Sequence, residues 1–250
     1  MRYFLKLAYN GTAYHGWQVQ PGDVTVQDVL QKSMGLLLRK KTVVVGAGRT
    51  DTGVHASEYF AHFDSEEALN HDFALRLNSL LPKDIAVYLI YQMTDEAHAR
   101  FDALSRTYEY TITSRKDPFL LDKAYYSWGK IDLAQMNQAA EILKTYCDFE
   151  AFSKTKTTVN NYLCRIDEAN WRQEGDLFIF KITANRFLRN MVRAIVGTML
   201  DIGRGKRTPE SLHEIITSKN RLNAGASAPA QGLSLIKISY PESIFRSQII

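Results

Sequence analysis

One loop of the sequence gathers the residue types that a catalytic carboxylate needs. Asp51 lies in residues 46–56, a glycine-rich stretch that also contains Arg49, Thr50 and Thr52. Its glycines allow backbone angles that other residues avoid. An adjacent guanidinium and hydroxyl donors favour the charged form of a carboxyl group, so we expect the pKa of Asp51 to lie below the reference value of about 3.9. Such a carboxylate suits a nucleophile or a base, whereas the alternative is that Asp51 only caps a turn.

A second candidate is an arginine in an apolar helix. We expect this helix to run from Phe187 to about Ile202, with one narrow stripe formed by Arg186, Asn190, Arg193 and Gly197. Apolar residues flank Arg193 on both sides, so its guanidinium would be partly buried and would need an acceptor. The alternative is that Arg193 reaches water at the edge of the helix.

Two tyrosines on one strand are a third candidate. Residues 106–113 alternate in polarity, which places Tyr108 and Tyr110 on the same face. Tyrosines at this spacing usually pack in a core. They are also side chains on which proteins stack unpaired bases, and Arg100 and Phe101 just upstream favour the RNA interpretation.

These side chains must be positioned by two similar sets of elements. The expected strands are residues 2–9, 42–45, 57–63, 85–92, 106–113, 149–152, 165–171, 177–183 and 233–240. The expected helices are one capped by Thr25 and reaching Leu38, then 72–81, 133–146 (capped by Asp132), 187–202, and a short one opened by Thr208-Pro209. Each half thus follows the order β-α-β-β-α-β, the split βαβ arrangement.

The expected fold class is therefore α+β, with two ferredoxin-like halves sharing a mixed, mainly antiparallel sheet. Residues 1–104 would carry the Asp51 loop, and residues 105–250 would carry the Tyr108 strand and the Arg193 helix. Such a fold serves enzymes and RNA-binding platforms alike, so it does not by itself indicate a function.

Composition narrows the class of protein. No apolar stretch approaches the roughly 20 residues of a membrane span, and the N-terminus has no signal-peptide pattern, which indicates a cytoplasmic protein. The two cysteines and six histidines are scattered, so no structural metal is expected. The net charge is +4, and its cations cluster, which favours a polyanionic partner. The clusters are Arg39–Lys41, Arg115–Lys116, Lys154 with Lys156, and Arg204–Arg207.

Together these residues identify a family resemblance that runs nearly end to end. The sequence resembles the tRNA pseudouridine synthase A family, and its match to the central catalytic motif at Gly48–Ala56 is highly specific. The other matching motifs are Asn10–Thr12 with Gly16–Gln18, Ala99–Ala103 with Arg106–Tyr110, Phe187–Arg193, and Ala228–Leu233. Two positions depart from the pattern: Thr52 stands where the family usually has alanine, and residues 156–162 lack an arginine often found there.

The resemblance implies a function and a set of roles. It implies the pseudouridine synthase fold and isomerisation of uridine to pseudouridine at positions 38, 39 and 40 of the anticodon stem-loop of tRNA. Asp51 would be the catalytic aspartate, Tyr108 would stack on the target base and could accept a proton, and Arg193 would form an ion pair with Asp51. Arg49 would join Tyr108 and Arg193 in binding the substrate. The family also implies a homodimer, with neither cofactor nor metal.

Two other classes of protein share parts of this pattern. Asp51-Thr52-Gly53 spells the aspartic protease signature, but those enzymes need two such carboxylates that share a proton, and this chain has one. A non-catalytic RNA-binding protein would keep the basic clusters and Tyr108 but would have no requirement for Asp51.

Overall fold

The computed structural model describes residues 1–155 and 160–249, so Lys156 and residues 157–159 of the threonine stretch lie outside the described part. The chain forms two compact units, Met1–Leu104 with Leu235–Ile250, and Ser105–Ser234. The C-terminal segment, which the sequence analysis placed in the second half, contacts the first unit through β10 (Phe245–Gln248), which pairs with β4 (Ile85–Met93).

The first unit has a ferredoxin-like arrangement. Its other elements are β1 (Arg2–Tyr9), η1 (Gly11–Ala13), α1 (Val26–Leu38), β2 (Val45–Gly46), β3 (His55–Asp64), α2 (Phe73–Leu80) and η6 (Glu242–Ile244). The strands lie in the order β10-β4-β1-β3, β2 also pairs with β3, and every pair is antiparallel. The chain order β-α-β-β-α-β with sheet order β4-β1-β3-β2 is that of the split βαβ motif.

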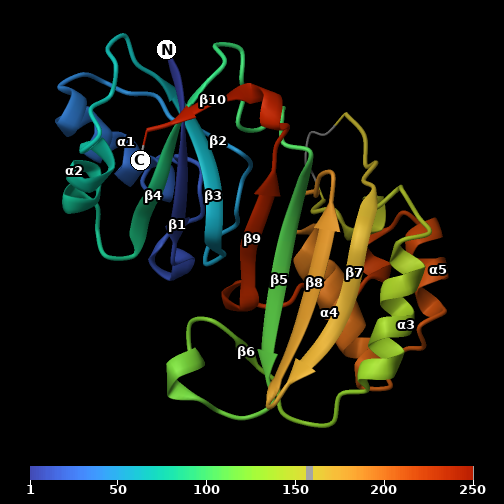
Figure 1. The fold of residues 1–250 in the computed structure, drawn as a ribbon. Coiled ribbons are helices and arrows are strands. Elements are labelled where there is room, and N and C mark those ends of the chain that lie inside the picture. Colours follow the sequence, from blue (N-terminus) through green and yellow to red (C-terminus); the bar gives the residue numbers. More distant parts are fainter. Residues whose placement is uncertain (156–159, 250) are drawn as a thin grey trace. The chain divides into compact units, whose positions relative to one another are not determined.

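The second unit has a related chain order, in which two strands precede its first long helix and two more separate that helix from the next. Its elements are β5 (Ser105–Thr113), η2 (Pro118–Leu120), β6 (Tyr125–Tyr126), α3 (Leu133–Leu143), η3 (Glu150–Phe152), β7 (Ile166–Glu174), β8 (Leu177–Ala184), α4 (Met191–Gly203), α5 (Ser211–Thr217), η4 (Arg221–Asn223) and η5 (Ala230–Gly232). β8 lies between β5 and β7 and is antiparallel to both, while β6 pairs in parallel with the end of β5. α3 packs on β7 and on α4 (Figure 1). The strand that follows, β9 (Leu233–Ser239), belongs to the first unit from Leu235 onward.

Local signals account for the starts of two helices. The Thr25 side chain accepts a hydrogen bond from the Asp28 amide at 3.4 Å, and the Asp132 side chain accepts one from the Gln135 amide at 3.1 Å. Each bond satisfies an amide that has no partner inside its helix. These two predicted caps, the α+β class and the mainly antiparallel pairing are confirmed.

Two predicted elements are wrong. Residues 149–152 form no strand, and η3 turns there as a 3₁₀ helix. The helix expected from Phe187 begins at Met191 instead, because Asn190 adopts a left-handed backbone conformation with φ of 65°. Arg186 and Asn190 therefore lie before α4, and only Arg193 and Gly197 of the predicted stripe are helical.

Burial is heaviest around α4. Its residues are apolar on almost every side and nearly all are buried, as expected of a helix enclosed by its own unit. Arg193 and Asp201 are the two half-buried exceptions within this apolar helix. No helix of the described chain is long and apolar enough to cross a membrane.

Candidate active site

Asp51 is presented by a tight turn between β2 and β3 of the first unit. The Val54 amide donates to the Asp51 carbonyl at 3.1 Å, which closes the turn. Gly53 lies inside it with φ of 77°, a backbone conformation that favours glycine. Asp51 is half-buried and Thr50 is buried, so this turn holds the carboxylate at a surface that water and a substrate can reach.

A second loop packs backbone against backbone on this turn. A Cβ at Gly16 would lie 2.3 Å from the Thr50 carbonyl oxygen, and one at Gly11 would lie 2.0 Å from the Val54 carbonyl oxygen. The Trp17 amide donates to the Thr50 carbonyl at 3.3 Å. These contacts explain why positions 11 and 16 are glycines, because a side chain at either position would push the Asp51 turn away.

Hydroxyl groups of two tyrosines hold the residues on either side of Arg49. The Tyr9 hydroxyl and the Thr50 hydroxyl share a hydrogen bond of 2.9 Å. The Tyr59 hydroxyl donates to the Gly48 carbonyl and accepts from the Gly48 amide. Tyr9 and Tyr59 belong to β1 and β3, so the sheet itself fixes the residues on either side of Arg49.

Arg49 differs from its neighbours in exposure. Its side chain is exposed, and it makes no ion pair with any residue of the described chain. The guanidinium therefore projects into solvent from a fixed backbone, where it can contact an anionic group.

The two tyrosines of β5 in the second unit have different surroundings. Tyr110 is fully buried, its hydroxyl donates to the Pro229 carbonyl at 2.8 Å, and burial raises its pKa. Tyr108 is only half-buried, and its ring meets the Phe187 ring edge-on, with centroids 5.2 Å apart and planes at 89°. Tyr110 therefore belongs to the core, while Tyr108 keeps part of its ring accessible in a defined orientation.

Arg193 has a backbone partner in its own unit. Its Nε donates to the Ala228 carbonyl at 2.8 Å, and the Ala228 amide donates to the Arg193 carbonyl at 2.9 Å. This carbonyl satisfies part of the demand for an acceptor that a half-buried guanidinium makes. The paired bonds also attach α4 to the segment at residues 224–232.

That segment is held to α4 by further close contacts. A Cβ at Gly197 would lie 1.7 Å from the Ala226 carbonyl oxygen, so only glycine allows this approach. The Asn190 amide side chain donates to the Ser227 hydroxyl at 2.6 Å, which Arg221 also contacts at 2.9 Å. The left-handed conformation of Asn190 thus aims its side chain at Ser227 and fixes the chain next to Arg193.

The four sequence-predicted site residues divide between the units. Arg49 and Asp51 lie on one turn of the first unit, and Tyr108 and Arg193 lie on β5 and α4 of the second. Sequence reasoning missed Phe187 as the partner of Tyr108, because Phe187 was assigned to the first turn of the expected helix. Within residues 1–155 and 160–249, no group of three or more His, Cys, Asp or Glu side chains is placed to hold a metal ion.

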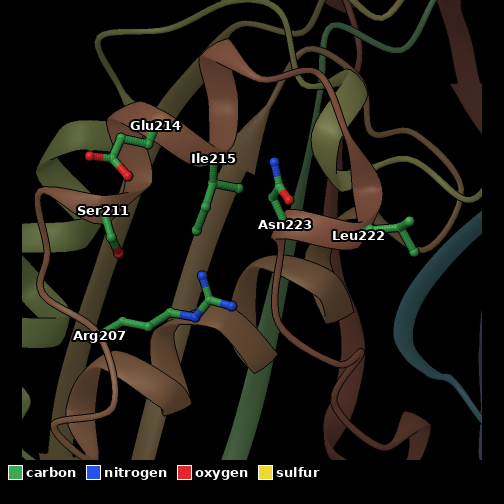
Figure 2. A pocket seen from close by; sticks show the side chains of 6 residues that line it. All are labelled: Arg207, Ser211, Glu214, Ile215, Leu222 and Asn223. Carbon is green, nitrogen blue, oxygen red and sulfur yellow. The ribbon is translucent and has the colours of Figure 1, made fainter.

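A separate hollow of about 390 Å³ lies on the second unit. Figure 2 shows side chains from α5 and η4 around the Arg207 guanidinium. It is lined by Arg207, Ser211, Glu214, Ile215, Leu222 and Asn223. None of the four predicted site residues is among them, so this hollow is not the candidate active site.

Comparison with known proteins shows that the chain is a pseudouridine synthase. The profile of a family described as tRNA pseudouridine synthase matches residues 139–241. Three similar proteins named tRNA pseudouridine synthase A come from Parabacteroides distasonis, Bacteroides fragilis and Bacillus licheniformis. The first is 50% identical over 246 residues and the second 51% over 247, and in both cases the match covers 98% of this chain and 98% of the relative. The Bacillus licheniformis protein is 38% identical over 246 residues, which cover 96% of this chain and 99% of the relative. The chain belongs to the tRNA pseudouridine synthase A family, whose members are isomerases that convert uridine to pseudouridine in tRNA.

Proposed function

We propose that this isomerase acts on uridines 38, 39 and 40 in the anticodon stem-loop of tRNAs, with Asp51 as its catalytic group. The observation that carries the proposal is the fixed turn at Asp51. Glycine contacts from Gly11 and Gly16 and the hydroxyl of Tyr9 hold this turn, while Asp51 itself stays half-exposed. A turn that only connected two strands would not need support from three directions.

The residue types suit the chemistry of isomerisation. The N1–C1′ bond breaks, the base turns, and C5 bonds to C1′. The hydrogen on C5 then leaves as a proton, and N1 gains one, so no electrons or phosphoryl groups are exchanged. An ionised Asp51 can start this sequence in three ways: by attack on C1′, by attack on C6, or by removal of a sugar proton.

The other predicted residues have supporting roles in the proposal. Tyr108 stacks on the target base, for which its half-exposed ring is suited. The cost of taking a uridine out of its stack, a few kcal/mol, is offset by such contacts and by phosphate contacts from cations such as Arg49. In this proposal residues 1–104 supply the Asp51 turn with Arg49, and residues 105–250 supply Tyr108 and Arg193. The ion pair between Arg193 and Asp51 stays a prediction.

Tritium release tests the proposal directly. The substrate is tRNA labelled with tritium at C5 of uridine, because each isomerisation frees one C5 hydrogen to water. We expect wild type to release tritium, and Asp51→Ala and Asp51→Asn to release none above background, while both variants keep the wild-type circular dichroism spectrum and a Kd for tRNA within about threefold. Turnover by either variant would contradict the role of Asp51. Binding without release by the wild type would indicate a non-catalytic RNA-binding protein.

We also propose that the protein is a homodimer and acts in the cytoplasm. The resemblance to the family supports the dimer, and the action of that family on tRNA supports the compartment. The molar mass of the purified protein in multi-angle light scattering tests the first, since one chain has a mass of 28.5 kDa.

A further inference from the structure

The segment between β5 and α3 exposes large apolar side chains that most proteins would bury. We call residues 115–130 the aromatic–basic segment. Its exposed fractions are 90% for Phe119, 70% for Leu121, 46% for Tyr126 and 80% for Trp128. Contiguous exposed apolar side chains usually mark a surface at which something binds.

The backbone of this segment is held in place. β6 pairs with the end of β5, and the Ser127 amide donates to the Thr113 carbonyl at 2.9 Å. The Arg204 guanidinium donates to the Ser127 hydroxyl at 2.7 Å. Asp117 caps η2 by accepting from the Phe119 amide at 2.9 Å. Figure 1 shows the segment leaving the end of β5 within the second unit. Its aromatic rings are therefore anchored at their backbones before any partner arrives.

Charge indicates the chemistry of the partner. The segment has four cations, Arg115, Lys116, Lys123 and Lys130, and only two carboxylates, Asp117 and Asp122. Arg115 pairs with Asp176 at 3.3 Å, whereas the three lysines form no ion pair with any described residue. Lysine is depleted from protein–protein interfaces. Lysines between exposed aromatic rings are instead typical of surfaces that bind unpaired nucleotides, through stacking and phosphate contacts.

We propose that the aromatic–basic segment binds the unpaired loop of the tRNA stem-loop, with Trp128 as a stacking platform. The inference rests on the proposed function and adds a second contact for the same substrate. Tyr108 and Thr113 lie five residues apart on β5, about 17 Å at 3.3 Å per residue. One stem-loop can span that distance. Stacking accepts any base, so this contact adds affinity for many tRNAs without reading their sequence.

Tryptophan fluorescence offers a direct probe. Trp128 is exposed, whereas Trp17 and Trp171 are only 2% and 4% exposed, so quenching by acrylamide reports on Trp128. We expect a 17-nucleotide anticodon stem-loop to quench the emission and to shield it from acrylamide. Trp128→Phe should lose this signal but keep its Kd within about threefold, because phenylalanine still stacks. Trp128→Ala should raise the Kd about fivefold to a hundredfold.

Matched variants separate this contact from the rest of the molecule. Leu222→Ser changes another exposed apolar residue of the second unit, 85% exposed, and should leave the Kd and tritium release unchanged. Lys123→Gln should lower the salt dependence of binding by about one phosphate contact.

If the wild type releases tritium but Trp128→Ala binds RNA as tightly as wild type, this inference is overturned and the proposed function stands. A change of oligomeric state in Trp128→Ala, with RNA affinity retained, would overturn it in favour of a second protein chain as the occupant. No tritium release by wild type would refute the proposed function itself.

Discussion

At the scale of single residues, the surroundings of each side chain separate chemistry from packing. Tyr108 and Tyr110 are two residues apart on one strand, and yet only Tyr110 is enclosed and hydrogen-bonded to Pro229. The edge-on contact with Phe187 restricts the Tyr108 ring without covering it. A ring held in this way loses little freedom when a base stacks on it, which preserves the free energy of stacking for binding.

Tyr108 offers a ring and a hydroxyl, and substitution can tell their contributions apart. Tyr108→Phe keeps the ring, so its Kd for tRNA should stay within about threefold of wild type. If the hydroxyl takes part in proton transfer, kcat should fall about a hundredfold or more. Tyr108→Ala should also weaken binding, by about fivefold to a hundredfold. Single-turnover kinetics with a filter-binding Kd check both; an unchanged kcat in Tyr108→Phe would rule out the proton-transfer role.

At the scale of elements, the Asp51 turn depends on the loop that precedes α1. Gly16 has φ of 86°, and a Cβ there would collide with the carbonyl of Thr50, the residue before Asp51. Gly48, on the other side of Arg49, faces open space. The two glycines therefore differ in what an added methyl group would displace, although both lie in or beside the same turn.

This difference predicts contrasting effects of the same substitution. Gly16→Ala should cost about 1–2 kcal/mol of stability from its left-handed backbone alone. It should also lower kcat about a hundredfold, because a shift of about 1 Å at a catalytic group costs that much. Gly48→Ala should keep kcat within about threefold. Thermal unfolding and tritium release check the pair, and equal activity of the two variants would contradict a fixed Asp51 turn.

Local signals in the sequence account for part of this architecture. Thr25 and Asp132 predicted their helix starts because a cap is decided by residues three positions apart. Asn190 and η3 were not predictable in this way. The left-handed turn at Asn190 is stabilised by Ser227, 37 residues later, and no nearby pattern indicates that contact.

The candidate site, too, was predictable only where nearby residues decide it. The composition of the loop at residues 46–56 was enough to single out Asp51, since glycines and polar residues gather there. The supports of that loop come from Gly11, Gly16 and Tyr9, which are more than thirty residues away in the sequence. Their part follows only from the tertiary contacts of the first unit.

At the scale of the whole molecule, the modest net charge of +4 matters through its distribution. Phosphate binding depends on local clusters of cations rather than on the total. Many acidic side chains are already neutralised by ion pairs, such as Asp64 by Arg2 and Glu58 by Lys6. Exposed cations such as Arg49 and Lys123 are available to bind phosphate groups.

Binding of tRNA should therefore weaken as salt increases. Each phosphate contact releases counterions, so four contacts give a slope of about −3 in a plot of log affinity against log salt concentration. Filter-binding measurements between about 50 and 200 mM salt give the slope. A slope near zero would exclude broad phosphate contact and leave stacking as the main source of affinity.

The structure predicts that the folded state loses stability in acid, and one source of this loss is His62 on β3. Burial first, and then the positive charge of Arg2 and the neighbouring His98, lower the pKa of His62 to about 4, against the opposing effect of Asp64 and Asp102. The side chain is 4% exposed, and its Nδ1 accepts from the Ala99 amide at 3.1 Å.

The folded state thus binds fewer protons than the unfolded chain, in which a histidine has a pKa of about 6.5. Stability from His62 is fully present above about pH 6.5 and is lost as the pH falls toward 4, by up to about 3 kcal/mol.

His62→Asn keeps an acceptor without the titration, so its urea midpoint should change less between pH 7 and pH 4.5 than that of wild type. His71→Asn, at an exposed histidine, should behave as wild type. Hydrogen exchange should locate the difference in β1 and β3 of the first unit rather than in β5 and β8, because His62 lies on β3 and pairs with Phe4 of β1. An identical pH response of wild type and His62→Asn would show that this histidine is not neutral in the fold.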